Sequence, residues 1–410
     1  MDYMKRIAVI GGGAAGMMAA GTASMYGADV TIYESTDRLG KKLAITGKGR
    51  CNVTNNADLD GLLKNVTKNS RFLYSAFSVF SSADTMSFFE GLGVTLKTER
   101  GNRVFPENDK AKTIVDALKS YCSGANKIFS KVKKILLNDD GSFTVSASED
   151  EIYDSVIIAT GGKSYPLTGS DGSGYRLAMK LGHTVTELKP SLIPLTSKDP
   201  ICSELQGLSL KNVAIEIAQK STGKRLYSDF GEMMFAHFGV TGPTVLSASA
   251  HIKDVDPTTL ALNIDLKPAL DEKTLDERLI SEFKSMANKD YINSLGGLLP
   301  SKMIEPFVRL TGIDPRRKVN SITKEERKRI LSTLKRLTID LNGTRPIEEA
   351  IITSGGIDVK EIRPGTMESK LVSGLYFAGE VIDVDAYTGG FNLQIAFSTG
   401  YLAGKNAAEC

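Results

Sequence analysis

The start of the chain alternates between short apolar runs and a stretch of small residues. Arg6–Ile10 and Asp29–Tyr33 are rich in β-branched residues, as buried strands are, and the small-residue stretch Ala14–Tyr26 between them has helical character. This order predicts a strand–helix–strand unit in which the two strands lie parallel and the helix packs closely on them.

Three regularly spaced glycines follow the first run directly. Gly11, Gly13 and Gly16 form GxGxxG, in which the first permits a tight turn, the second lets the backbone approach a pyrophosphate and the third lets the helix approach the strand. Glu34 ends the second run, where a carboxylate can accept hydrogen bonds from a ribose diol. A signal peptide also has basic residues before an apolar stretch, but the glycine spacing favours a dinucleotide site.

The residues around the glycines limit which cofactors this unit can bind. No basic residue stands beside Glu34 to hold a 2′-phosphate, which leaves FAD or NAD. The following segment, residues 38–55, is a long basic, glycine-rich and amide-rich loop that a plain NAD domain does not need. Two further β-type runs end in glycine, at Gly161 and at Gly379. Because ligands bind outside the carboxyl ends of parallel strands, these ends can converge on one extended cofactor, which favours FAD.

The pattern changes in the middle of the chain. Short β-type runs occupy residues 190–270, and residues 271–337 are strongly charged and helical in character, with Ile330, Leu331, Leu334 and Leu337 spaced for one face. The sequence therefore predicts an α/β protein with a doubly wound, glutathione-reductase-like FAD-binding domain and an inserted β-rich domain that carries a helical subdomain. The expected FAD-binding parts are 1–189 and 354–410, and the inserted domain comprises 190–270, the helical subdomain 271–337, and 338–353.

Composition adds several exclusions. The 410 residues are 41% hydrophobic and 24% charged, with a formal net charge of +3, which is too balanced for a general polyanion partner. No apolar run is long enough to predict a membrane span. Four separated cysteines, with Cys410 at the end of the chain, form no CxxC pair, so neither a metal site nor a disulfide framework is expected, and a cytoplasmic location fits.

The sequence also limits how electrons can reach the flavin, because it lacks a redox dithiol motif and a second dinucleotide-binding motif. Disulfide reductases of related architecture carry CxxxxC beside the flavin, but here only Cys51 occurs, and it is interpreted as a packing residue. No second GxGxxG follows a strand. A nicotinamide donor, NADH or NADPH, is therefore expected to bind transiently at the flavin or not at all.

Several longer motifs carry a family resemblance. GGGAAG, LGKKLAITGKGRCNVTN, RVFP, ATGGKSYPLTGSDGSGY, HFGVTGP and GLYFAGEVIDVDAYTGGFN together resemble the BaiN-like family of FAD-dependent oxidoreductases over nearly the whole chain. That family is similar to aminoacetone oxidase, to flavoenzymes that reduce 3-oxo-steroid or bile-acid double bonds and, more distantly, to the fumarate reductase flavoprotein. Asn102 and Ala236 depart from the family's usual glycine and threonine.

The resemblance implies roles for individual residues. Glu34 would bind the adenosine ribose, Lys42 and residues 50–52 would lie along the flavin, Val132 would contact adenine through its backbone, and Glu380 would meet the ribityl–pyrophosphate region. The full expected cofactor set is Gly11, Gly13, Ala14, Ala15, Gly16, Glu34, Arg38, Lys42, Gly49, Arg50, Cys51, Asn52, Val132, Thr160, Gly161, Gly162, Gly379, Glu380, Gly389, Gly390, Phe391, Asn392 and Leu393. The N-terminus of the expected helical stretch Phe391–Ala403 would stabilise negative charge on the flavin.

Three residues are catalytic candidates. His237 can exchange a proton near neutral pH, although a histidine that only hydrogen-bonds its loop fits the same segment. Tyr165 is a second possible donor, and Arg103 can orient a carbonyl or carboxylate, or pair with the pyrophosphate or an acid. His183 and His251 are interpreted as structural or surface residues.

The predicted activity is a two-step flavin cycle on a small-molecule substrate. In the preferred interpretation, NAD(P)H reduces FAD, which then reduces the activated C=C bond of an α,β-unsaturated ketone such as a steroid or bile acid. The alternative is a flavin amine oxidase that releases peroxide. A remote alternative is a flavin-containing RNA-binding or sensing protein, since Arg316–Lys318 and Lys324–Arg329 are basic, but interleaved glutamates favour a solvated face and make nucleic acid an unexpected partner.

Overall fold

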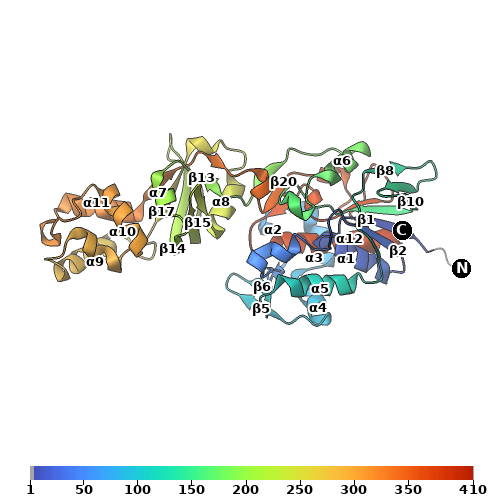
Figure 1. Ribbon diagram of the computed structural model, residues 1–410, viewed down its shortest axis with the longest axis horizontal. Helices are drawn as coiled ribbons and strands as arrows, with labels where there is room; N and C mark the ends of the chain where they lie inside the picture. Colours follow the sequence, from blue (N-terminus) through green and yellow to red (C-terminus); the bar gives the residue numbers. More distant parts are fainter. Residues whose placement is uncertain (1–3, 410) are drawn as a thin grey trace. The chain divides into compact units, whose positions relative to one another are not determined.

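The apolar run at the start of the chain forms the centre of a parallel sheet. The computed structural model describes residues 4–409. Contacts divide the chain into a first unit, up to Ser191 and from Ile347 onward, and a second unit, Leu192–Pro346 (Figure 1). The buried apolar side chains form two clusters, one in each unit.

The first unit is built on a five-stranded parallel sheet in the order β21-β11-β1-β2-β7. Almost every residue of the three central strands is buried, as is typical of a parallel sheet that is covered on both faces. The strands are β1 (Arg6–Ile10), β2 (Asp29–Tyr33), β7 (Asn126–Ile128), β11 (Ser155–Ile158) and β21 (Leu375–Phe377).

Two helices from opposite ends of the chain pack against each other beside this sheet. α1 (Ala14–Met25) and α12 (Phe391–Glu409) cross where Gly400 and Gly404 face α1. A Cβ added at Gly400 would lie 2.5 Å from the Ala15 carbonyl oxygen, and one added at Gly404 would lie 2.3 Å from that of Ala19. Only glycine allows this approach of the two backbones.

Smaller elements complete the first unit. Its remaining sheets are β3-β6-β5, β10-β9-β8, β12-β20 and β22-β4. The strands are β3 (Thr54–Asn55), β4 (Val66–Lys68), β5 (Leu96–Glu99), β6 (Arg103–Pro106), β8 (Lys134–Leu137), β9 (Phe143–Ser146), β10 (Asp150–Tyr153), β12 (Lys189–Ser191), β20 (Ile352–Ser354) and β22 (Asp385–Ala386). The helices are α2 (Leu59–Lys64), α3 (Tyr74–Val79), α4 (Ser82–Gly91), α5 (Ala111–Tyr121) and α6 (Ser173–Lys180).

The second unit combines a seven-stranded antiparallel sheet with helices. The sheet order is β18-β17-β14-β15-β16-β13-β19. Its strands are β13 (Leu195–Thr196), β14 (Ser209–Gln219), β15 (Arg225–Ala236), β16 (Gly239–Thr241), β17 (Leu260–Asp265), β18 (Leu337–Asp340) and β19 (Gly343–Thr344). The helices are α7 (Pro200–Glu204), α8 (Pro243–His251), α9 (Glu272–Ser285), α10 (Ser301–Thr311) and α11 (Lys324–Lys335), the last three lying between β17 and β18 in the chain.

The predicted α/β architecture is confirmed, with two corrections of detail. Leu337 was expected on the helical face with Ile330 and Leu334, but it is the first residue of β18, because α11 ends at Lys335 and the chain then turns into the sheet. The C-terminal helix is also longer than the expected stretch to Ala403, since it continues to Glu409.

The crossing of α1 and α12 makes a stability prediction. Gly404→Ala places a methyl group against the Ala19 carbonyl and should lower the free energy of unfolding of the first unit by about 3 kcal/mol. Gly91→Ala, at the end of α4, is the matched control because its Cβ would meet open space. Thermal unfolding followed by circular dichroism checks both. Equal melting temperatures for the two variants would contradict the prediction.

Candidate functional site

The turn between β1 and α1 has the conformation that its glycines predict. Gly11 has a φ of +107°, and a Cβ there would lie 2.5 Å from the Ala159 carbonyl oxygen of the neighbouring strand end. A Cβ at Gly16 would lie 1.8 Å from the Gly11 carbonyl oxygen, but one at Gly13 would meet nothing within 4 Å. Gly13 is the N-cap of α1 and brings no capping side chain. The helix N-terminus is therefore open to an anion.

Glu34 is held rigidly at the end of β2. Its side chain is 7% exposed, and its two oxygens accept hydrogen bonds from the backbone N–H groups of Gly12 at 2.9 Å and Thr36 at 2.8 Å. Each carboxylate oxygen keeps a further lone pair for a ligand hydroxyl. This geometry fits the predicted contact with a ribose diol.

The glycine-bearing strand ends meet at one edge of the sheet. Ile10 of β1 is paired with Ile158 of β11, and Ile158 with Phe377 of β21, so the residues after these three parallel strands lie side by side. Thr160–Gly162 and Gly379 follow two of them. A Cβ at Gly162 would lie 2.8 Å from a Glu380 carboxylate oxygen, which shows how closely these segments approach.

Two residues predicted separately to contact the cofactor are bound to each other. The Lys42 ammonium donates to Glu380 Oε2 at 2.8 Å and to the Ser164 hydroxyl at 2.8 Å. Glu380 Oε1 accepts from the Ser164 hydroxyl at 3.1 Å and from the Thr353 N–H at 2.9 Å. The pair joins the loop after β2 to the C-terminal segment, and Ser164 and Thr353 were not foreseen because nothing local in the sequence marks them.

The Arg50 side chain has partners that the sequence did not reveal. Its guanidinium donates to Glu99 at 2.5 Å and Asp109 at 2.6 Å and lies 4.2 Å from the centre of the Phe105 ring. The hydrogen bonds to Glu99 and Asp109 raise the pKa of Arg50. Arg50 thus ties its loop to the β5–β6 hairpin, and its guanidinium is already occupied.

The neighbours of Arg50 differ in character. Cys51 is fully buried at a φ of +59°, and burial raises the pKa of its thiol to about 12. The thiol therefore stays protonated at neutral pH, as a packing residue would. The buried Asn52 Oδ1 has no hydrogen-bond partner in the described chain, and a bound cofactor with an N–H or O–H group would satisfy it.

The N-terminus of α12 adjoins the same region. Gly390 has a φ of +98°, and a Cβ there would lie 2.3 Å from the Thr54 carbonyl oxygen. Asn392 is used internally, because its side chain exchanges hydrogen bonds with the backbone N–H and carbonyl of Ala386. Ala14, the first residue of α1, belongs to the first unit. So do the predicted residues Arg38, Gly49, Val132 and Leu393, of which Arg38 is exposed and Val132 is buried.

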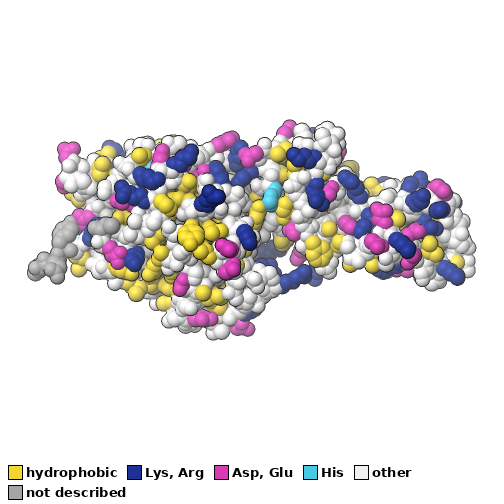
Figure 2. Space-filling view, turned by 180° about the vertical axis from the view of Figure 1, so that it is seen from behind, with side chains coloured by type: hydrophobic (Ala, Val, Ile, Leu, Met, Phe, Trp, Pro, Cys, Tyr) yellow, Lys and Arg dark blue, Asp and Glu magenta, His cyan; other side chains and the backbone are white. Residues whose placement is uncertain are grey.

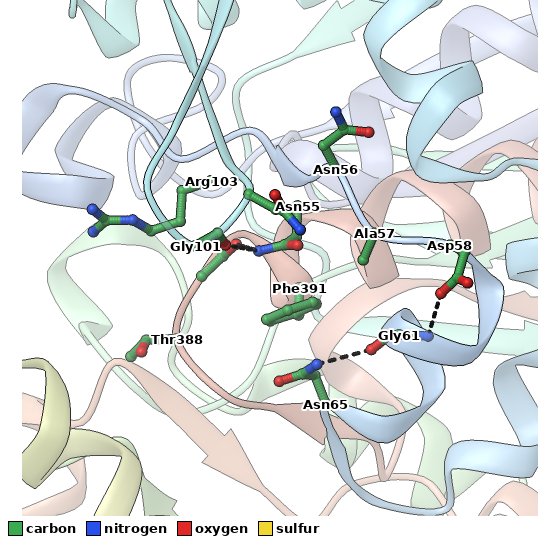
Figure 3. Close-up of a pocket in the computed structure, with 12 residues that line it drawn as sticks. Asn55, Asn56, Ala57, Asp58, Gly61, Asn65, Gly101, Arg103, Thr388 and Phe391 are labelled. Atoms are coloured by element: carbon green, nitrogen blue, oxygen red, sulfur yellow. Dashed lines mark hydrogen bonds between the residues drawn. The ribbon is translucent and has the colours of Figure 1, made fainter. Parts of the chain in front are cut away.

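A polar cavity of about 720 Å³ opens within the first unit (Figure 3). Four asparagine amides and one arginine contribute to its wall, together with a single aromatic ring. The lining residues are Asn55, Asn56, Ala57, Asp58, Gly61, Asn65, Gly101, Asn102, Arg103, Thr388, Gly389 and Phe391. Arg103, Gly389 and Phe391 were predicted from the sequence, but the asparagines that line the cavity were not. The asparagine-rich run Asn52–Asn56 was the feature of the sequence that could have indicated them.

The three catalytic candidates fall in different places. Arg103 lines the cavity, where its Nε donates to the Arg100 carbonyl at 3.0 Å. Tyr165 has a φ of +54°, and its ring centre lies 6.0 Å from the Lys42 ammonium. His237 belongs to the second unit, at the exposed turn between β15 and β16, with its ring edge-on to Phe238.

The other two histidines have structural surroundings. His183 is buried, its Nε2 lies 2.8 Å from the Ser369 hydroxyl, and burial lowers the pKa of its imidazole. His251 packs against the Tyr227 ring, and burial lowers the pKa of its imidazole as well.

Acidic side chains pair with several basic residues of the segments 316–318 and 324–329 in the second unit. Arg317 pairs with Glu326 at 2.8 Å, Lys318 with Asp290 at 2.8 Å and Arg327 with Asp276 at 2.7 Å. Figure 2 shows positive and negative side chains intermixed over this helical part. These pairs reduce the positive field that a polyanion would meet.

Membrane-spanning helices and metal-binding clusters are absent from the part of the chain that the structure describes. Within residues 4–409, no helix is long and apolar enough to cross a membrane. No group of three or more His, Cys, Asp or Glu side chains in that described part could hold a metal ion.

Known proteins resemble this chain over its full length. It matches the family model described as HI0933-like protein Rossmann domain over residues 5–406. It is 30% identical over 413 residues to the 3-dehydro-bile acid delta(4,6)-reductase of Clostridium scindens. That alignment covers 99% of this chain and 100% of the relative. It is 29% identical over 401 residues to the ribosomal RNA dihydrouridine synthase of Escherichia coli K12, covering 97% and 96%.

A solved structure supports the fold. The 3-ketosteroid-delta4-(5alpha)-dehydrogenase from Rhodococcus jostii RHA1, in complex with 4-androstene-3,17-dione, aligns with a TM-score of 0.54 at 15% identity, covering 100% of this chain and 98% of that one. The family resemblance carried by the glycine and GKGRCN motifs is confirmed by the family match. The protein is therefore an FAD-dependent oxidoreductase that belongs to the HI0933-like Rossmann-domain family.

Proposed function

We propose that this protein reduces a C=C bond conjugated to a carbonyl group, using electrons that NADH or NADPH delivers to its FAD. The observation that carries the proposal is the shared chemistry of two full-length relatives. One is named as a reductase of bile-acid double bonds and the other as a synthase of dihydrouridine, which is uridine with its ring C=C bond saturated. Both products arise by adding a hydride and a proton across such a bond.

The first unit offers residues to hold the cofactor. The open N-terminus of α1 at Gly13 would receive the pyrophosphate, and Glu34 the adenosine ribose. Lys42, Glu380 and the unpartnered Asn52 amide would face the flavin half. FAD held there would be the source of the hydride, and the N-terminus of α12 would favour negative charge on the reduced cofactor.

The cavity would position the substrate for that transfer. We propose that Arg103 donates hydrogen bonds to the substrate carbonyl, because its terminal NH₂ groups have no carboxylate within 4 Å among the described residues. Polarising the carbonyl makes the β carbon accept hydride more readily. The α carbon then takes a proton, for which Tyr165 and His237 are the proposed donors.

A first prediction concerns FAD retention. Glu34→Ala removes the ribose acceptor and leaves the Gly12 and Thr36 N–H groups without their partner, so the FAD dissociation constant should rise at least tenfold. Asp37→Ala is the control, because Asp37 is an exposed carboxylate in the same loop and pairs with Lys41. This variant should leave the FAD dissociation constant unchanged. Titration of the apoprotein by flavin fluorescence measures both, and equal constants would remove Glu34 from the site.

A second prediction concerns the reaction itself. Under anaerobic conditions NADH or NADPH should bleach the flavin band, and a conjugated enone should then restore it with one C=C bond reduced per flavin. Stopped-flow absorbance with product analysis measures this. Bleaching by primary amines such as aminoacetone instead, with peroxide formed on admitting air, would establish the amine oxidase and refute the reductase.

A third prediction concerns the substrate-activating group. Arg103→Lys should slow flavin reoxidation by the substrate about a hundredfold, because a donor aimed at the carbonyl is lost, while the reduction of FAD by nicotinamide stays the same. Arg100→Lys, on the exposed turn beside it, is the control. An unchanged reoxidation rate in the Arg103 variant would exclude this role.

The same assay distinguishes between the two proposed proton donors. Tyr165→Phe and His237→Ala should each retain FAD, and the true donor is the residue whose loss slows reoxidation and changes its pH dependence. If neither variant slows reoxidation, the proton comes from solvent.

A further inference from the structure

The chain leaves the first unit after Ser191 and re-enters it at Ile347, and its two passages are joined close to this boundary. β12, which ends at Ser191, pairs antiparallel with β20, so that Ser191 lies opposite Ile352 and Lys189 lies opposite Ser354. Both strands belong to the first unit. They form a short ribbon, β12–β20, through which the chain passes to and from the second unit.

One buried carboxylate is bound to both strands of this ribbon. Asp385 is 0% exposed, its Oδ2 accepts a hydrogen bond from the Ser191 hydroxyl at 2.9 Å, and its Oδ1 accepts one from the Ser354 hydroxyl at 2.9 Å. Both serines are buried as well. A buried carboxylate costs free energy unless its oxygens accept hydrogen bonds, so these two hydroxyls hold the side chain in one position.

The residue after Asp385 is in turn bound to the start of α12. The Ala386 N–H donates to Asn392 Oδ1 at 2.9 Å, and Asn392 Nδ2 donates to the Ala386 carbonyl at 2.7 Å. Asn392 is the second residue of α12. Thr388 and Gly389, which line the cavity, lie between the two bonded residues in the chain. Hydrogen bonds therefore connect the ribbon to the N-terminus of this helix.

β22 has a second support that does not involve the carboxylate. Its backbone pairs with β4, where Asp385 lies opposite Lys68, and the Thr67 hydroxyl donates to the Asp385 carbonyl at 3.1 Å. A change in the Asp385 side chain should therefore leave the strand paired with β4 and remove only its bonds to the ribbon.

We infer that Asp385 is a positioning residue, which fixes the start of α12 against the flavin by holding β22 to both strands of the ribbon. The inference rests on the proposed function, in which the N-terminus of α12 faces the flavin. The influence of a helix N-terminus on a nearby charge falls off within the first turn, so a small displacement of this end weakens it. Asp385 acts through the helix and not by contact with the cofactor.

Position and charge have opposite effects on the midpoint potential of the flavin. If the start of α12 is displaced, it stabilises the reduced cofactor less and the potential falls. If the negative charge of Asp385 is merely removed, the reduced and negatively charged cofactor is repelled less and the potential rises. The sign of the shift therefore separates the two causes.

The decisive experiment measures the midpoint potential of the FAD-loaded protein against a reference dye in two variants of Asp385. In Asp385→Ala the ratio of reduced to oxidised flavin at a fixed potential should fall about tenfold, which corresponds to a decrease of about 30 mV for a two-electron couple. Asp385→Asn keeps an acceptor for one serine and an N–H group for the other, so its potential should not fall. An unchanged or raised potential in Asp385→Ala, or an equal fall in Asp385→Asn, overturns the inference.

A milder variant tests the same bonds from the ribbon. Ser354→Ala removes one of the two hydroxyl donors, so the Ala386 amide should exchange its hydrogen about fivefold faster and the potential should fall. Thr22→Val is the matched control, because it removes another buried hydroxyl of the first unit, 3.0 Å from that of Tyr121, and should change neither quantity. A wild-type potential in Ser354→Ala refutes the inference, whatever the exchange rate and whether or not Asp385→Ala folds.

Failure of this inference and failure of the proposed function give different results. If nicotinamide bleaches the flavin and an enone restores it, but the potential of Asp385→Ala does not fall, the reductase proposal stands and the positioning role is refuted. If only amines reduce the flavin, the reductase proposal is refuted, and the potentials still decide the role of Asp385.

Discussion

The close contact between the backbones of α1 and α12 is the constraint on which the first unit depends. Gly400 and Gly404 let α12 lie against the carbonyls of Ala15 and Ala19, so the first and last helices of the chain share one layer. Both helices then begin near the carboxyl ends of the parallel strands. The N-terminus of α1, which has no capping side chain, and that of α12 can thereby serve one ligand in the proposed function, the first a pyrophosphate and the second the charge on a flavin.

Much of this arrangement could be predicted from the sequence because its causes are local. A tight turn needs Gly11, a close helix needs Gly16, and a ribose acceptor needs an acid after the second strand, so the residue types at fixed spacings reveal the unit. The helical and β-rich character of the inserted region is local too. Leu337 was misplaced because one apolar residue after a helix fits a helical face and a strand equally well.

The contacts that were not predicted are those between distant segments. Arg50 was expected to face the flavin, but the acids that bind it follow 49 and 59 residues later in a separate hairpin. Glu380 and Lys42 were each assigned to the cofactor, but nothing in the spacing shows that they bind each other. Asn55 was predicted only as the last residue of a basic loop, because the two carbonyls that its amide binds belong to other parts of the chain. Such pairings arise only when the sheet brings the segments together.

The order of strands in the central sheet has a consequence for synthesis on the ribosome. β21 lies at one edge of the sheet, next to β11, yet it is made more than two hundred residues after β11. The second unit is continuous in sequence and has its own core, so it can fold while the first unit still lacks a strand and its last helix. A nascent chain therefore carries an incomplete first unit until β21 and α12 have been made, and the proposed FAD site can be fully enclosed only after that.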